Sequence, residues 1–173
     1  MSRSAQIETH FFADDGRTPN HPRLPLIVMR HTEAAESEDP AKWFETRFTS
    51  HGWGSPWRWE VYPYHHFHST NHEVLGVSRG SATLMLGGEE GGEFHVTVGD
   101  VLVLPAGLGH MSLSASQDFQ VVGAYPRGEK PDLMRPDEGN LDAARGRIGK
   151  VPLPDLDPVY GGEGPLKDHW LGG

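Results

Sequence analysis

Two stretches of the chain decide its fold: HFHSTNHEVLGVSRG at residues 66–80 and GDVLVLPAGLGH at residues 99–110. Their spacing can be written H-x-H-x4-E-x6-G and G-x5-P-x-G-x2-H. Short apolar runs bounded by glycine, proline and small polar residues are typical of strands joined by tight turns. The two stretches therefore predict a β-barrel with potential metal ligands on its strands and turns.

The first stretch places two histidines on one face of a strand. Because side chains alternate along a strand, His66 and His68 share a face, with Cα atoms about 7 Å apart. A turn then leads to a return strand that starts at Glu73, and His110 follows the Pro-x-Gly turn of the second stretch. Three imidazoles and one carboxylate suit one divalent ion of Fe, Mn, Ni, Zn, Co or Cu, and leave coordination positions open for substrate or O2. The chain has no cysteine, which excludes a thiolate site.

Other interpretations of these histidines stay open. A surface histidine tract could resemble the first stretch, but it would not carry the matching glutamate or the second stretch. A barrel could also keep its glycines and prolines and hold no metal. His72 is a rival ligand because it lies four residues after His68, although that spacing suits a helix better than a strand and a turn.

The two stretches resemble the two motifs of the cupin family. The first motif is matched at His66, His68, Glu73 and Gly80, and the second at Gly99, Pro105, Gly107 and His110. One departure is Ser114, where the family usually has asparagine in a structural position. Residues 11–16, 57–59 and 151–161 are also similar to the YjlB-like group of bacterial single-domain cupins. The resemblance implies an all-β chain with a cupin-type double-stranded β-helix (jelly-roll) barrel; it does not imply a particular reaction.

The composition limits the kind of protein. The formal charge is −9 and no basic cluster is present, so we expect no nucleic-acid partner. No apolar run approaches the roughly 20 residues of a membrane span, and no signal peptide is evident. The absence of cysteine fits a cytoplasmic location. The 22 glycines and 14 prolines suit a fold of short strands and tight turns.

We expect one domain over residues 1–173, with three parts. Residues 1–56 form N-terminal strands (9–12 and 24–30) and one short helix, which starts at Asp39-Pro40 and ends at Gly52. Residues 57–126 form the barrel core. Its expected strands are 57–68, 73–79, 81–87, 93–98, 101–104, 110–115 and 119–125. Residues 127–173, rich in proline, form an extended tail that wraps over the barrel or reaches a neighbouring subunit, with Trp170 as an anchor.

Strand alternation also nominates Tyr62 and Tyr64 as catalytic side chains, because both share the face of His66 and could hydrogen-bond a substrate. The alternative is that both tyrosines fill the barrel. We expect a small-molecule enzyme of the oxidoreductase (dioxygenase-like) type. The alternatives are a metal-dependent isomerase or lyase and a non-catalytic binder. By resemblance, and because exposed edge strands favour pairing, we also expect a homodimer.

Overall fold

The computed structural model describes residues 5–172, and most of its regular structure is strand. In chain order the elements are β1 Gln6–His10, β2 Leu26–Arg30, a 3-10 helix Glu33–Glu36, α1 Pro40–Ser50, β3 Trp53–Trp59, β4 Glu73–Arg79, β5 Ser81–Leu86, β6 Gly92–Thr97, β7 Val101–Leu104, β8 His110–Ala115, β9 Gln120–Pro126, α2 Leu141–Lys150 and α3 Pro165–Trp170. None of the described helices is both long and apolar enough to cross a bilayer.

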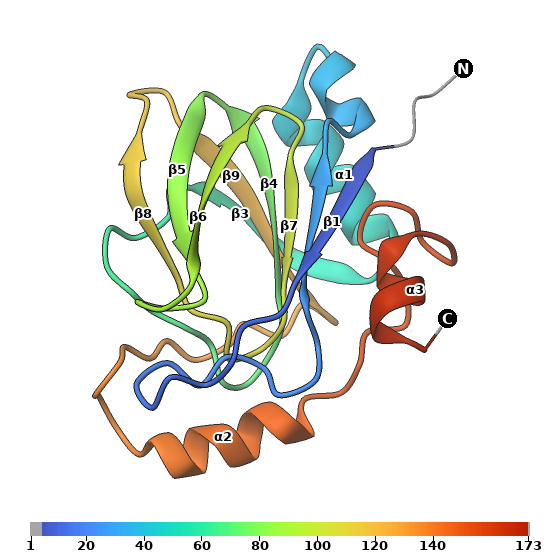
Figure 1. The fold of residues 1–173 in the computed structure, drawn as a ribbon. Helices are drawn as coiled ribbons and strands as arrows, with labels where there is room; N and C mark the ends of the chain where they lie inside the picture. The colour runs from blue at the N-terminus through green and yellow to red at the C-terminus, as the bar shows by residue number, and fades with distance from the viewer. Residues whose placement is uncertain (1–4, 173) are drawn as a thin grey trace.

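The strands form two antiparallel sheets that face each other (Figure 1). The larger sheet has six strands in the order β1-β2-β7-β4-β9-β3, and the smaller has three in the order β6-β5-β8. Apart from β1–β2 and β5–β6, the strands that pair within these sheets are not consecutive in sequence, and two facing sheets connected in this way are the jelly-roll arrangement. The expected mostly-β chain with antiparallel sheets is therefore confirmed.

Alternation along β4 separates two apolar cores. Leu75 and Val77 point between the sheets, where they join buried side chains such as Leu84 and Leu102. Val74 points to the opposite face of the larger sheet and belongs to the other core. Glu73 is in phase with Leu75 and Val77, so this alternation turns its carboxylate toward the space between the sheets.

Helix α1 covers the outer face of the larger sheet (Figure 1). Asp39 caps it as predicted, since its carboxylate accepts a hydrogen bond from the Lys42 N–H at 3.2 Å. The Phe44 and Phe48 rings are fully buried against β4 and β9. Gly76 makes this packing possible, because a Cβ at that position would lie 2.7 Å from the Phe44 ring.

The prediction of an extended C-terminal tail is wrong. The structure has two helices there: α2 crosses one end of the barrel, and α3 lies at the outer side (Figure 1). Between them the buried Asp157 carboxylate accepts three backbone N–H hydrogen bonds, from Val159, Tyr160 and Leu166. These hydrogen bonds fix the segment whose apolar side chains Val159 and Leu166 are buried in the core. The anchoring role of Trp170 is confirmed, since it is buried and its Nε1 donates to the Pro25 carbonyl at 2.9 Å.

The predicted strands at 73–79, 101–104 and 110–115 match β4, β7 and β8, and three others lie within one residue of β5, β6 and β9. The N-terminal strands begin elsewhere than predicted, with β1 at 6–10 and β2 at 26–30. The predicted strand 57–68 is wrong beyond Trp59. Pro63 removes a backbone donor there, and the later residues pair with two separate segments instead of one strand.

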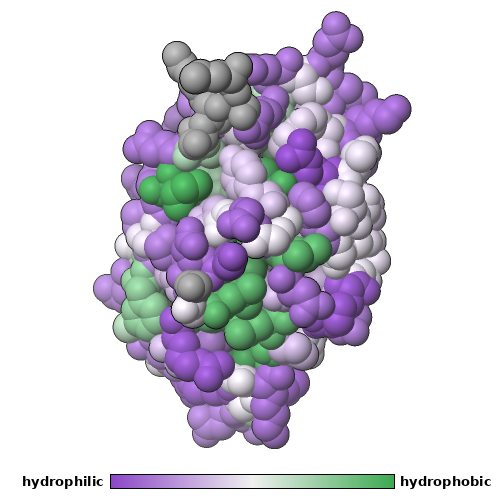
Figure 2. Space-filling model, turned by 90° about the vertical axis from the view of Figure 1, so that its right-hand side faces the viewer, coloured by the Kyte–Doolittle hydropathy of each residue, from purple (hydrophilic) through white to green (hydrophobic). Residues whose placement is uncertain are grey.

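The face of the molecule on the right-hand side of Figure 1 is mostly hydrophilic. On the face shown in Figure 2, hydrophilic side chains predominate and apolar ones gather in a few groups among them. Among the described residues, the exposed large apolar side chains include Phe11, Trp59 and Leu133.

Candidate metal centre and cavity

Backbone pairing brings the three histidines together. The His66 N–H donates to the His110 carbonyl at 3.2 Å, and the His110 N–H donates to the His66 carbonyl at 2.9 Å. The intervening Phe67 turns the other way, is fully buried and pairs with Met134. His66 and His68 therefore point to the same side as His110, as alternation predicted.

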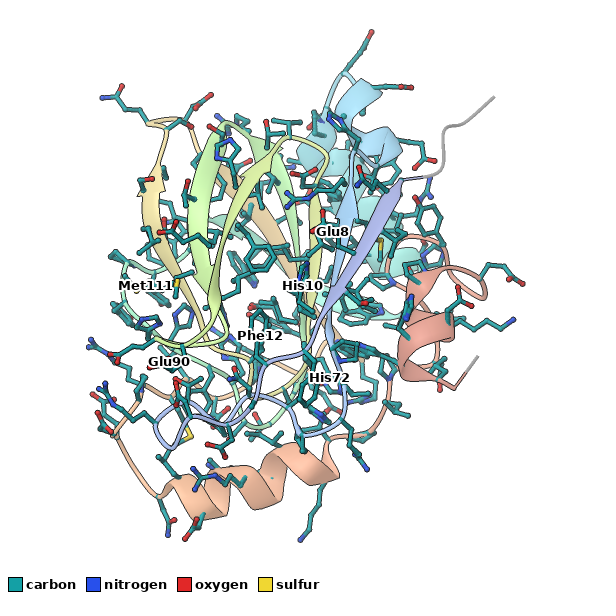
Figure 3. All side chains as sticks on the ribbon, in the orientation of Figure 1. Glu8, His10, Phe12, His72, Glu90 and Met111 are labelled. Atoms are coloured by element: carbon teal, nitrogen blue, oxygen red, sulfur yellow. The ribbon has the colours of Figure 1, made fainter. Side chains whose placement is uncertain are left out.

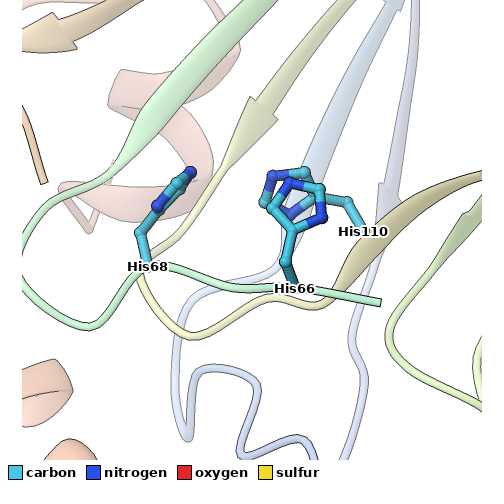
Figure 4. A group of neighbouring side chains, drawn as sticks. All are labelled: His66, His68 and His110. Carbon is cyan, nitrogen blue, oxygen red and sulfur yellow. The ribbon is translucent and has the colours of Figure 1, made fainter. Parts of the chain in front are cut away.

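The four predicted ligands converge. Figure 4 shows the rings of His66, His68 and His110 facing one space, and their ligand nitrogens lie within 4.8 Å of one another. From the first residue of β4, a Glu73 carboxylate oxygen lies 3.4 Å from the Nε2 atoms of both His68 and His110. All except His68 are almost fully buried, and His68 is partly so.

Hydrogen bonds to the other ring nitrogen orient each imidazole. Nδ1 of His66 lies 3.0 Å from the Tyr64 carbonyl, Nδ1 of His110 lies 3.0 Å from the Leu108 carbonyl, and Nδ1 of His68 lies 2.5 Å from a third carbonyl. A carbonyl can only accept, so each Nδ1 must carry the hydrogen. In the neutral rings Nε2 then has a free lone pair that points into the shared space, as in most histidine metal ligands.

Burial and mutual contact set the charge of the cluster. Burial alone would raise the pKa of Glu73, but the His68 and His110 imidazoles hold the pKa of this carboxyl well below its usual range. Burial and the neighbouring His110 lower the pKa of His66 to about 2. Burial opposes charge on His68 as well, yet the Glu73 carboxylate raises the pKa of His68 above its ordinary value. The cluster thus holds a buried anion whose charge a proton or a metal cation can balance.

These residues fit a divalent metal ion. First-row ions bind imidazole nitrogen and carboxylate oxygen at about 2.0–2.2 Å, which the converging side chains can reach with small adjustments. A set of three nitrogen donors and one oxygen donor, without thiolate, suits Fe, Mn, Ni, Zn, Co or Cu. His66, His68 and His110 form a group that could hold a metal ion.

A cavity of about 530 Å³ opens onto the cluster. Its walls are mostly aromatic and aliphatic, and the ligand side chains are part of its lining together with Trp57, Trp59, Val61, Tyr62, Leu75, Tyr125 and residues 130–133. This volume is within the range of sites for small organic molecules.

The structure treats the two nominated tyrosines differently. Tyr62 lines the cavity, and its ring meets His66 edge-on at 5.2 Å. Tyr64 is not among the lining residues; it stacks behind Tyr62 at 4.9 Å, and the Arg135 guanidinium covers its ring at 4.1 Å.

Sequence reasoning missed Tyr125 and Trp57 as cavity residues. The pairing of Val74 with Ala124 places Tyr125 opposite Glu73 in the sheet, and the Trp57 Nε1 donates to the Tyr125 hydroxyl at 2.8 Å. The buried Tyr125 has a raised pKa because of its burial and the nearby Glu73 carboxylate. The signal that could have found Tyr125 is strand register, which requires knowing that β9 pairs with β4.

His72, the rival ligand, lies elsewhere. Its Nδ1 accepts a hydrogen bond from the Ala106 N–H at 2.8 Å, and its ring packs against Trp170 at 4.9 Å. Figure 3 shows His72 on the side of the barrel that carries α3. The structure therefore separates His72 from the cluster that contains Glu73.

Comparison with known proteins identifies a relative over nearly the full length of the chain. No protein-family model matches the chain. The chain is 42% identical over 166 residues to the uncharacterised protein YjlB of Bacillus subtilis (strain 168), covering 96% of this chain and 98% of that protein. Two solved structures resemble it more distantly. One is acireductone dioxygenase from Bacillus anthracis with a cadmium ion in its active centre (14% identity, 76% of this chain and 99% of that one, TM-score 0.42). The other is the WlaRB TDP-quinovose 3,4-ketoisomerase from Campylobacter jejuni (15% identity, 53% and 73%, TM-score 0.41).

Likenesses as weak as the last two say nothing about the reaction. The relative at 42% identity covers nearly the whole of both chains, and the two motifs lie where the barrel brings their side chains together. The chain belongs to the YjlB-like group of cupins.

Proposed function

We propose that the chain binds one divalent metal ion through His66, His68, Glu73 and His110 and is an oxidoreductase of the dioxygenase type that acts on a small molecule. One observation carries this proposal: three imidazoles, each oriented through Nδ1, and one buried carboxylate face one space beside a cavity. A bound ion of this class supplies Lewis acidity and open coordination positions for substrate oxygen or O2.

The walls of the cavity would hold the rest of the substrate. Trp57, Trp59 and Leu75 offer apolar surface that excludes water and favours an aromatic or aliphatic body. Tyr62 packs beside His66 and Tyr125 lies near Glu73, and the hydroxyl of either can donate a hydrogen bond to substrate oxygen. We assign Tyr62 a direct role in catalysis, and Tyr64 the role of holding the Tyr62 ring in place.

The alternative reactions differ in what they consume. An isomerase or lyase would use the ion only to polarise a carbonyl and would not require O2. A non-catalytic binder would hold the same small molecules without turnover. We also propose that residues 1–173 form one domain and that the protein is cytoplasmic. We further propose that it forms a homodimer, and light scattering can measure this oligomeric state.

Metal analysis comes first in the test. Protein made without a histidine tag and without chelators should contain about one equivalent of a first-row metal, or should take one up with high affinity. Oxygen uptake is then measured with the Fe(II)-loaded protein against small molecules that carry neighbouring oxygen atoms, with Glu73→Gln as the matched variant. Oxygen uptake that Glu73→Gln depresses supports the proposal. Metal binding with turnover that is the same under anaerobic conditions would favour the isomerase or lyase, and failure to bind metal would refute the site.

A further inference from the structure

The His68 ring depends on a distant part of the chain. His66 and His110 both place Nδ1 against a carbonyl two residues earlier in their own segments. His68 instead places Nδ1 against the backbone carbonyl of Asp132, 64 residues away. Among the three histidines, only His68 is therefore oriented by the segment that follows β9.

We infer that Asp132 is a positioning residue for His68, and that its carboxylate holds the carbonyl that fixes this ring for metal binding. The inference rests on the proposed metal site. The Asp132 carboxylate accepts hydrogen bonds from the Ser69 N–H at 2.7 Å, the Ser69 hydroxyl at 2.5 Å and the Thr70 N–H at 3.2 Å. These donors belong to the two residues that follow His68, so the carboxylate ties the start of the turn to the carbonyl.

Three further contacts strengthen this connection. The Asp132 N–H donates to the Thr70 hydroxyl at 2.9 Å, so the backbone of each segment is tied to the other. From α2, the Arg147 Nε donates to the fully buried Ser69 hydroxyl at 2.8 Å, and its guanidinium lies 3.9 Å from the Asp132 carboxylate. Through Arg147, helix α2 thereby contacts both Ser69 and Asp132, the two residues that the connection joins.

The opposite side of the same segment is also fixed. The Phe67 N–H donates to the Met134 carbonyl at 2.8 Å, and the Met134 N–H donates to the Phe67 carbonyl at 2.9 Å. Residues 132 and 134 thus flank His68 with hydrogen bonds to residues 67, 69 and 70. Between them, Leu133 faces the cavity, so the segment that orients His68 also forms part of the substrate wall.

The carboxylate can be tested separately from the carbonyl, because every residue at position 132 keeps the carbonyl. Asp132→Ala removes all the side-chain acceptors and frees the carbonyl to move. Asp132→Asn keeps one acceptor oxygen for the Ser69 N–H and should rescue much of the effect. Asp137→Asn is the matched control, since Asp137 is an exposed aspartate of the same segment that pairs with Arg17.

Two readouts are needed. The first is affinity for Co(II), titrated with the metal alone; outer hydrogen-bond partners of metal ligands typically contribute about 10–100-fold. We expect a loss of this size for Asp132→Ala, a smaller loss for Asp132→Asn and no change for Asp137→Asn. The second is the ¹⁵N spectrum of the imidazoles in the metal-free protein. Asp132→Ala should weaken the Nδ1–H signal of His68 and leave those of His66 and His110 unchanged.

The readouts distinguish the possible failures. If Asp132→Ala is folded, by its melting profile, and both the Co(II) affinity and the His68 spectrum match the unaltered protein, the positioning role is refuted. If the unaltered protein binds no Co(II) but the His68 signal still changes, the proposed metal site fails and the positioning of His68 stands. Equal changes in all three imidazole signals would show a general loosening of the barrel and would also refute the specific role.

Discussion

The barrel contains two groups of buried histidines that differ in what their Nδ1 atoms do. In the cluster of His66, His68 and His110, each Nδ1 meets a carbonyl and carries a hydrogen. In the pair of His21 and His72, whose rings lie 6.3 Å apart, each Nδ1 instead accepts a backbone N–H. When its rings are neutral, the cluster therefore presents free Nε2 lone pairs, whereas the neutral pair presents Nε2–H groups.

This difference in hydrogen bonding determines which of the buried histidines are suited to bind a metal ion. A ring whose Nδ1 already accepts a backbone hydrogen bond uses that lone pair for structure and, when neutral, has none left on Nε2 for a metal. Glu73 strengthens the contrast, because its carboxylate faces His68 and His110. His72 precedes β4 and Glu73 begins it, yet their side chains point in opposite directions, with His72 packed against Trp170 and Glu73 facing the cluster.

The largest effect is expected from removing a member of the cluster. His68→Ala should lose most of the bound metal, with a drop in affinity beyond the roughly 10–100-fold typical of outer partners. The reason is that this variant removes one of the four proposed protein donors. Metal content after dialysis measures this loss. If the variant retains one full equivalent of metal, the contrast between the cluster and the pair fails.

His72→Ala should have the reverse outcome. The substitution removes a fully buried ring that packs against Trp170, which leaves a cavity, and it deprives the Ala106 N–H of its hydrogen-bond acceptor. We expect a loss of about 2–5 kcal/mol in the free energy of unfolding, the range for large-to-small core substitutions. Metal content per folded chain should stay nearly constant, as measured by denaturant unfolding and metal analysis on the same sample. If His72→Ala empties the site and Glu73→Ala does not, the proposed ligand set is wrong.

These two variants concern the part of the site that sequence predicted best. Alternation and motif spacing correctly placed His66, His68, Glu73 and His110 together, because strand periodicity is local. Tyr125 and Asp132 could not be predicted in this way. The position of Tyr125 depends on which strands pair, and that of Asp132 depends on the path of the chain after β9. Local residue spacing predicts neither.

The prediction of an extended C-terminal tail failed for a different reason. The prolines of this segment favour extended structure, but the segment also contains two residues that are typical of helix starts. Asn140 precedes α2 and accepts the Ala143 N–H at 3.1 Å, and Pro165 stands at the first position of α3. The structure of the segment between them depends on buried contacts of Asp157 that no local pattern reveals.

In the pair of His21 and His72, the contribution of His21 to stability should depend on pH. Burial and the nearby Arg23 lower the pKa of His21 to about 4, from an ordinary value near 6.5. The unfolded chain binds this proton first as the pH falls, so the contribution to stability is complete above about pH 6.5 and is lost between about pH 6.5 and 4. His21→Asn can keep an acceptor for the Leu24 N–H and removes the titration, and should reduce the slope of stability against pH by up to roughly 1.4 kcal/mol per pH unit. Unfolding curves across this range measure it, and an unchanged slope would contradict a neutral, buried His21.

The smallest effect is expected at His65, which precedes the cluster in sequence but is not part of it. His65 is partly exposed, and alternation turns it away from His66. His65→Ala should leave the metal content unchanged and alter the unfolding free energy by no more than about 1 kcal/mol. A marked loss of metal in this variant would show that the register of the first motif is shifted by one residue.

The most direct measurement of the central claim is anomalous diffraction from crystals grown with one equivalent of a first-row metal. The account predicts one peak, bound at about 2.0–2.2 Å by the Nε2 atoms of His66, His68 and His110 and by a Glu73 carboxylate oxygen, with its open side facing the cavity. A peak between His21 and His72, or four side chains that stay several ångströms apart with no peak, would contradict it.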